Sequence, residues 1–94
     1  MAEPILLRVL TEAGLAVEEA ASSIIAPGEV GYLGMLKNHA PLVTTLQPGT
    51  LTWRQAGGEH RTLRVGTGLL EIAHNCCTLL TSTVSEEPSP TAGP

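Results

Sequence analysis

The chain has 94 residues, a formal net charge of −4, 43% hydrophobic residues, and one Trp, one Tyr and no Phe. This length fits one domain of the usual size of roughly 100–150 residues and excludes a large multi-domain enzyme, and its core must be built from Leu, Ile, Val and Ala. The sparse, mildly acidic charge argues against a nucleic-acid binder, because such proteins need a basic surface to displace counterions.

The N-terminal residues and the two cysteines indicate the compartment. Residues 1–5 carry an acid and no basic cluster, so we expect neither a secretory signal nor an Arg-rich transit peptide. No apolar run approaches the roughly 20 residues that a membrane span requires. We therefore expect a reducing cytosol, where Cys76 and Cys77 stay thiols. Because they are adjacent, they cannot join distant segments, which excludes a disulfide scaffold.

Ten Gly and seven Pro residues divide the chain into short apolar runs, a spacing typical of an all-β sandwich rather than a helix bundle. Residues 11–26 are the exception. They are rich in Ala and Glu and begin with a Thr that could cap a helix, so local propensity favours a helix over part of them. The apolar pairs Leu15/Val17 and Ile24/Ile25 fit strands about as well, and the pattern leaves the choice open.

Residues 28–45 form the most specific stretch of the sequence. Three glycines are interleaved with an apolar patch that includes Tyr32, Leu33, Met35 and Leu36. A loop of this length with exposed apolar residues usually contacts a partner. A plain core strand with turn glycines would absorb the same apolar residues without any partner, and the pattern alone does not decide between the two.

Two strands with alternating apolar residues flank the glycines near residue 57. Leu51 and Trp53 alternate with polar residues in the first strand, and Leu63 and Val65 do so in the second. A two-residue turn at the glycines would turn the apolar residues of the two strands to opposite faces. We therefore predict a three-residue loop at residues 57–59, or a glycine bulge, which pairs Trp53 with Leu63 and Leu51 with Val65.

Gly66 and Gly68 stand where a phosphate-binding loop could begin. A Walker loop requires a wider glycine spacing, a Lys for the phosphates and a Ser or Thr for magnesium, and this segment has none of them. We therefore interpret the two glycines as a bulge or tight turn between strands, and we reject nucleotide binding by this loop.

A second hairpin is predicted over residues 69–81, with a two-residue turn at His74 and Asn75. Its expected pairs are Leu70 with Leu79, Ile72 with Cys77, Glu71 with Thr78, and Ala73 with Cys76. The first two pairs form one apolar face, and the other two suit solvent or a sheet edge.

His74, Cys76 and Cys77 form a dense cluster that could bind a metal or act as a nucleophile. Structural zinc needs four ligands, however, and neighbouring residues on a strand point to opposite faces. Nothing in the sequence identifies an orienting third group for a Cys–His pair. We therefore predict a buried Cys77, an exposed Cys76, no metal site and no catalytic residue.

The last ten residues of the chain are polar and rich in Pro. Such a segment buries too little apolar surface to offset the entropy of ordering it. We therefore predict one β-sandwich domain over residues 1–84 and a disordered tail over residues 85–94.

Several short motifs occur in a fixed order along the chain. They are Ala26-Pro27-Gly28, Gly31-x-Leu33-Gly34, Asn38-His39-Ala40-Pro41-Leu42, Leu46-x-Pro48-Gly49 and Gly66-x-Gly68-Leu69-Leu70-Glu71-Ile72. In this order and at these intervals they resemble the N-terminal β-sandwich domain of the ε subunit of the F-type ATP synthase. The resemblance covers residues 6–83. Any one motif alone would be a weak signal, and the ordered set is a strong one.

The resemblance implies an all-β fold, a flattened ten-stranded β-sandwich, and therefore strands over residues 11–26. It implies a non-catalytic rotor subunit of the central stalk, which links the γ subunit to the ring of c subunits and couples ion translocation to ATP synthesis. The partners would be γ and the c ring, in an assembly with α and β, with no cofactor, no nucleic acid, and membrane association through partners only. We expect a bacterial chain, peripheral on the cytoplasmic side of the cell membrane.

The same resemblance implies the site residues. Those that match the family loop lying against the c ring are Glu29, Val30, Gly31, Tyr32 and Leu33. Those that match positions facing γ are Thr11, His39 and Thr44. Tyr32 stands where many members carry Glu, so an ionic contact at that point is not carried over. The chain is similar to short members of the family, because its Pro-rich tail cannot form the C-terminal helical hairpin that restrains ATP hydrolysis in longer ones.

Two other classes of function are weighed against this one. A regulatory β-domain would sense a ligand such as a nucleotide, and calorimetry with ATP and magnesium would detect the heat of binding. A free-standing β-domain enzyme would use His39 or a cysteine as its nucleophile, and its cysteine version would lose activity on thiol modification.

Overall fold

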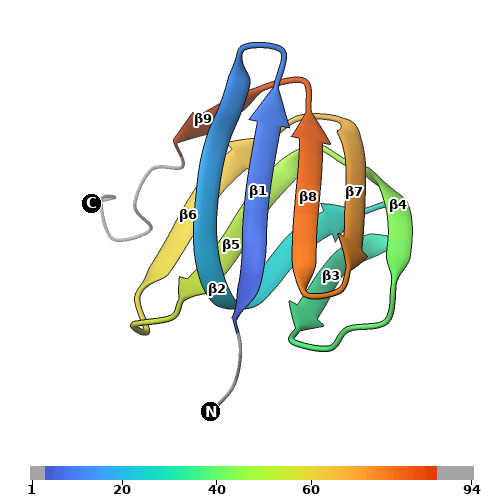
Figure 1. Ribbon diagram of the computed structural model, residues 1–94. Helices are drawn as coiled ribbons and strands as arrows, with labels where there is room; N and C mark the ends of the chain where they lie inside the picture. The colour runs from blue at the N-terminus through green and yellow to red at the C-terminus, as the bar shows by residue number, and fades with distance from the viewer. Residues whose placement is uncertain (1–3, 87–94) are drawn as a thin grey trace, which may run out of the picture.

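The computed structural model describes residues 4–86 and contains nine β-strands there and no helix in that range (Figure 1). The strands are β1 (Ile5–Thr11), β2 (Gly14–Gly28), β3 (Gly31–Leu36), β4 (Leu42–Leu46), β5 (Gly49–Gln55), β6 (His60–Val65), β7 (Gly68–Ala73), β8 (Cys76–Thr81) and β9 (Val84–Glu86). In this part of the chain, no helix could cross a membrane. The predicted all-β class is confirmed. Residues 11–26 end β1, turn at residues 12 and 13 and continue as β2, so the helix that their composition favours is wrong.

The long strand β2 belongs to both layers of the sandwich. Its first half pairs with β1, which continues through β8 and β7 to β4, and its second half pairs with β3 on one side and β5 on the other. The register of β2 against β5 shifts between Ala21 and Ser23, where the strand passes from one layer to the other. The family resemblance implies ten strands, and the described residues form nine, because β2 runs through both layers as one continuous strand.

The core lies between these layers and is almost entirely aliphatic. Alternate residues of β1, β7 and β8 point inward from one layer, and alternate residues of β2 and β5 point inward from the other. Trp53 is the largest fully buried side chain. The buried core residues are Ile5, Leu7, Val9, Ala21, Ile24, Ala26, Met35, Leu46, Leu51, Trp53, Val65, Leu70, Ile72, Cys77 and Leu79. A small sandwich can therefore form its core with one aromatic residue.

The β7–β8 hairpin has the predicted register. Leu70 pairs with Leu79, Ile72 with Cys77, Glu71 with Thr78 and Ala73 with Cys76. His74 and Asn75 form the turn with positive φ angles of 52° and 59°, which match the right-handed twist of the two strands. Cys77 is buried as predicted, because neighbouring side chains on a strand point to opposite faces. The prediction of an exposed Cys76 is wrong, since its side chain is half-buried.

The predicted register of the β5–β6 hairpin is wrong by two residues. Leu51 pairs with Leu63 and Trp53 with Arg61, whereas we predicted Leu63 opposite Trp53. The cause is the turn, which closes between Gln55 and Glu59: the Gln55 amide donates to the Glu59 carbonyl at 2.7 Å, and the Gly58 amide donates to the Gln55 carbonyl at 2.8 Å. Gly58 adopts a φ of 102°. A slip of two residues keeps each side chain on its face, so the predicted inward alternation holds.

Gly66 and Gly68 permit close contact between chain segments. A methyl group on Gly68 would overlap the carbonyl oxygen of Leu80 on β8. A methyl group on Gly66 would lie 2.5 Å from the hydroxyl of Ser82, and the Gly66 amide donates to the Thr81 hydroxyl at 2.9 Å. The structure thus explains both glycines as a tight approach between strands.

The C-terminal end of the described chain is β9, which pairs with β6. It ends at Glu86, two residues beyond the predicted domain boundary after residue 84. Residues 87–94, most of the predicted tail, lie outside the described residues.

Candidate partner-binding surface

The β2–β3 turn is the most exposed apolar feature of the fold. Gly28 pairs with Gly31, so Glu29 and Val30 occupy the two central positions of a tight turn. Gly31 has a φ of 131°, which side-chain-bearing residues rarely adopt, and this explains its place in the motif. Val30 is fully exposed. A valine in full contact with water adds nothing to the core of the isolated fold, and on its own such a residue is ordinary; it gains interest from the apolar pocket beside it.

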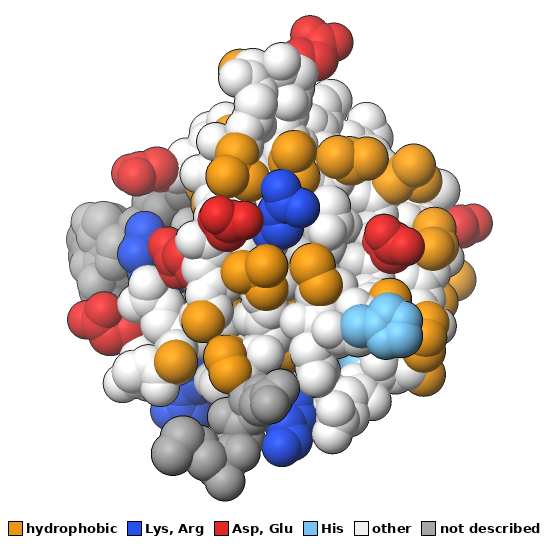
Figure 2. Space-filling model, in the orientation of Figure 1, with side chains coloured by type: hydrophobic (Ala, Val, Ile, Leu, Met, Phe, Trp, Pro, Cys, Tyr) orange, Lys and Arg blue, Asp and Glu red, His pale blue; other side chains and the backbone are white. Residues whose placement is uncertain are grey.

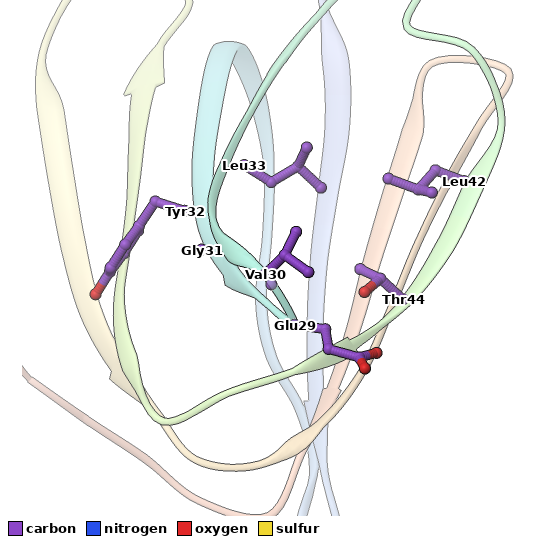
Figure 3. A pocket seen from close by; sticks show the side chains of 8 residues that line it. Glu29, Val30, Gly31, Tyr32, Leu33, Leu42 and Thr44 are labelled. Carbon is purple, nitrogen blue, oxygen red and sulfur yellow. The ribbon is translucent and has the colours of Figure 1, made fainter.

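A shallow apolar pocket of about 180 Å³ lies between this turn and β4. Its lining consists of Gly28, Glu29, Val30, Gly31, Tyr32, Leu33, Leu42 and Thr44. Figure 3 shows Leu33 of β3 and Leu42 and Thr44 of β4 pointing toward one another across the pocket, while the Tyr32 ring points the other way, toward β5. All five residues predicted to contact the c ring therefore border this pocket, with the Tyr32 ring turned away from it, and Thr44, predicted to face γ, belongs to the same lining.

Hydrogen bonds from two other strands fix the turn on either side of Val30. On one side the Thr45 hydroxyl donates to the Glu29 carboxylate at 3.2 Å, and the Gln47 amide donates to that hydroxyl at 3.4 Å. On the other side the Tyr32 hydroxyl accepts the Thr50 backbone amide at 3.1 Å. The turn is thus attached to β4 on one side and to β5 on the other.

The three residues predicted to face γ do not form one cluster. His39 lies in the β3–β4 connection, next to the β7–β8 turn, where the Asn38 amide donates to the Asn75 side chain at 2.6 Å. Thr11 ends β1 at the opposite end of that layer, and its hydroxyl accepts the Ala13 amide at 3.1 Å (Figure 1). About five strand residues, or roughly 16 Å, separate these two ends of the sheet.

His39 lines a second, more polar pocket of about 260 Å³ together with Asn38, Ala40, Pro41, His74 and Asn75. Its Nδ1 lies 2.7 Å from the Ala40 carbonyl, so Nδ1 carries the proton and donates there. This leaves Nε2 as a hydrogen-bond acceptor for a partner. Among residues 4–86, no three His, Cys, Asp or Glu side chains gather as a metal site would require.

The outer face of β4, β7 and β8 carries apolar residues that the sequence analysis did not single out. Val43, Leu69 and Leu80 are all exposed, and Leu69 pairs directly with Leu80. Figure 2, which looks onto the outer face of β1, β8 and β7, shows apolar side chains between charged ones. The signal that could have found them is strand alternation: they occupy the outward positions, where polar residues are usual in an antiparallel sheet.

Charge is concentrated at a different place, on β2, β5 and β6. The Glu19 carboxylate accepts the Trp53 indole N–H at 3.0 Å and the Gln55 amide at 2.8 Å, and it pairs with Arg61 at 3.7 Å. The hydrogen bond from Trp53, then that from Gln55, lowers the pKa of Glu19, and the Arg61 charge adds to this. Arg61 lies 6.0 Å above the Trp53 ring. This cluster covers the edge of the buried Trp53.

The two cysteines differ in burial. Burial, with a smaller contribution from the neighbouring Cys76, raises the pKa of the Cys77 thiol to about 12. Its Sγ lies 3.9 Å from the Met35 sulfur, inside the core. Cys77 is therefore a structural residue, since a thiol that does not ionise near neutral pH is a poor nucleophile.

Comparison with known proteins shows which family the chain resembles. Residues 5–87 match the family described as the ATP synthase Delta/Epsilon chain, beta-sandwich domain. The ATP synthase epsilon chain of Desulforapulum autotrophicum is 38% identical over 80 residues, which cover 85% of this chain and 59% of that one. The epsilon chain of Moorella thermoacetica is 39% identical over 83 residues, covering 86% and 62%. This chain thus spans about 60% of the length of these relatives.

Two solved structures share the fold. A chain in the Euglena gracilis mitochondrial ATP synthase structure of OSCP, F1 and c-ring superposes with a TM-score of 0.83 at 19% identity, covering 92% of this chain and 55% of that one. A chain in the central stalk and c-ring structure of the Tetrahymena thermophila mitochondrial ATP synthase gives 0.75 at 16% identity, covering 96% and 72%. Both superpositions confirm the β-sandwich.

Proposed function

The chain belongs to the β-sandwich family of the ATP synthase delta and epsilon chains, and from this premise we propose that it is a non-catalytic rotor subunit of a bacterial F-type ATP synthase. In this role it lies in the central stalk, links the γ subunit to the c ring, and helps couple ion translocation to ATP synthesis. The observation that carries the proposal is the fixed β2–β3 turn, which presents fully exposed Val30 beside an apolar pocket.

The proposed c-ring contact is formed by the turn and the start of β3. It consists of Glu29, Val30, Gly31, Tyr32 and Leu33, which line one face of the pocket. An exposed valine flanked by a carboxylate suits the end of a small helical membrane protein, where apolar and polar groups alternate at the water boundary. Its contribution is the burial of apolar surface rather than an ion pair, since Tyr32 carries no charge.

The proposed γ contact follows the β4 edge from His39 to Thr44. His39 offers Nε2 as an acceptor, and Thr44 lies in the pocket next to the proposed c-ring residues. Thr44 is thus where the two proposed contacts meet, and Thr11, at the other end of the sandwich, would be a separate point of contact. A partner touching both His39 and Thr11 must span roughly 16 Å, which the side of a coiled coil does.

The proposed location follows from these partners. We place the chain on the cytoplasmic side of the bacterial cell membrane, held there by γ and the c ring within an assembly that includes α and β. The two curated relatives named above are bacterial, which supports this assignment.

The test is co-purification of the tagged chain from its native membranes in mild detergent, with subunits quantified by mass spectrometry. The proposal predicts recovery of γ, α, β and c subunits in fixed ratios to this chain. The matched control is Val30→Asp, which should lose c subunits before it loses γ. Recovery of the wild-type chain alone, from membranes that contain γ, would contradict the proposal.

A further inference from the structure

Tyr32 is an exposed residue whose hydroxyl group binds within its own chain. Its side chain is 61% exposed, yet its hydroxyl accepts the Thr50 backbone amide at 3.1 Å. The neighbouring residue on β5 is Gly49, where a methyl group would lie 2.6 Å from that hydroxyl and 3.0 Å from Pro27 Cβ. The hydroxyl therefore fits against β5 only because position 49 is a glycine.

Glu29 holds the other side of the turn in the same way. Its carboxylate accepts the Thr45 hydroxyl at 3.2 Å, and Gln47 donates to that hydroxyl in turn. The polar groups of Glu29 and Tyr32 are thus directed toward their own chain, to either side. Val30, between them, has no apolar neighbour covering it and points into solvent.

Resting on the proposed function, we propose that Tyr32 is a positioning residue: its hydroxyl, bound to β5, holds the β2–β3 turn in the conformation that presents Val30 to the c ring. Tyr32 then acts through Val30. A turn held in its bound conformation before it meets its partner loses less entropy on binding, which raises affinity without adding a contact. Glu29 supports the same arrangement from the β4 side.

Contact and positioning leave different kinetic signatures. Removing a contact residue weakens the formed complex and raises the dissociation rate. Loosening the turn instead lowers the fraction of molecules that are ready to bind, which reduces the association rate in proportion. Val30→Ala should therefore act on dissociation, and Tyr32→Phe, which keeps the ring and removes the hydroxyl, should act on association.

The test measures binding kinetics of the full chain to the γ–c rotor, purified in detergent from membranes of a host strain that lacks this chain. We expect Val30→Ala to raise the dissociation rate roughly tenfold, as the loss of two buried methyl groups implies. We expect Tyr32→Phe to lower the association rate roughly threefold to tenfold, the range of one hydrogen bond. Ile25→Ala, another exposed apolar residue of β2 that lies outside the pocket and both proposed contacts, is the matched control and should change neither rate.

A second measurement needs no partner. Nitrogen-15 relaxation should show lower order parameters at Val30 and Gly31 in Tyr32→Phe than in the wild type. Gly49→Ala should destabilise the wild type more than it destabilises Tyr32→Phe, because the hydroxyl that the new methyl group meets is absent there. If Gly49→Ala does not fold but the Tyr32→Phe/Gly49→Ala double variant does, the coupling between positions 32 and 49 is present and stronger than expected.

The outcomes separate this inference from the proposed function. If the wild type binds the rotor, any one of three results would overturn the positioning role and leave the rotor assignment standing. These are an unchanged association rate in Tyr32→Phe, unchanged order parameters in that variant, and equal effects of Gly49→Ala in both backgrounds. A wild-type chain that does not bind the rotor would overturn the rotor assignment, and with it the purpose assigned to the turn.

Discussion

The β2–β3 and β7–β8 turns are both tight and both are held by hydrogen bonds from other segments, but they differ in what occupies the tip. In the β7–β8 turn, His74 and Asn75 supply the left-handed backbone that a two-residue hairpin needs, both are polar, and the Asn75 side chain binds Asn38. In the β2–β3 turn, a fully exposed Val30 occupies the tip, and the Thr45 hydroxyl and the Thr50 backbone amide hold the turn from outside. The polar tip of the β7–β8 turn thus makes its own bonds. The apolar tip of the β2–β3 turn makes none and depends on β4 and β5 to keep it in place.

The largest effect is expected in the β7–β8 hairpin, from Gly68→Ala. The new methyl group would overlap the Leu80 carbonyl, so the two strands would have to separate at this point. We expect a loss of about 3 kcal/mol or more in the free energy of unfolding, from overpacking against backbone. Urea denaturation monitored by Trp53 fluorescence measures it. Gly57→Ala, where a methyl group meets nothing within 4 Å, is the control and should change much less.

Asn75→Ala tests the local specification of the β7–β8 turn. The substitution removes the bonds to Asn38 and places Ala at a φ of 59°, a conformation that costs a non-glycine residue roughly 1–2 kcal/mol. We expect a total loss of about 2 kcal/mol. Asn75→Gly keeps the backbone conformation accessible and should lose less. Equal losses in both variants would show that side-chain bonds, rather than the left-handed backbone, stabilise this turn.

Val30→Asp tests whether the tip of the β2–β3 turn serves binding rather than stability. Because Val30 is fully exposed, the free energy of unfolding should stay within about 0.5 kcal/mol of the wild type. Affinity for the γ–c rotor should fall by at least tenfold, about 1.4 kcal/mol. A large loss of thermal stability with unchanged affinity would show that Val30 supports the fold and does not contact the rotor.

The smallest effect is expected outside both turns, at Glu19. Its folded-state pKa is lowered, chiefly by the Trp53 indole bond, so it contributes stability above its unfolded pKa and loses it as the pH falls through the lower folded value. The stability advantage of the wild type over Glu19→Gln should therefore shrink as the pH falls below about 4.5. Melting temperatures between pH 7 and pH 3 measure it; parallel curves for the two proteins would contradict the lowered pKa.

The two hairpins show what the sequence could predict. The β7–β8 register was predictable because a two-residue turn aligns the apolar residues of both strands. The β5–β6 register was missed because the turn begins one residue earlier than predicted, at Ala56, and Gly58 supplies its left-handed residue. Residues 11–26 have helix-like composition, yet they pair with β1, β3 and β5, and this pairing overrides local propensity.

The candidate site was predictable as a segment but not as an arrangement. Residues 29–33 stand out through their glycines and apolar side chains, and they do line one surface. The partners that hold the turn, Thr45 and Thr50, lie on or beside other strands, and nothing in the sequence relates them to Glu29 or Tyr32. The separation of Thr11 from His39 likewise depends on the layer order, which local patterns do not contain.

The most direct test of the rotor assignment is site-specific photocrosslinking in native membranes. A photoreactive amino acid at position 30 is predicted to crosslink to a c subunit, identified by mass spectrometry. The same amino acid at position 15, which is also exposed but lies near the β1–β2 turn, should not. Crosslinks to c from position 30 alone would support the account. Absence of a c crosslink at position 30, or equal crosslinking from both positions, would contradict it.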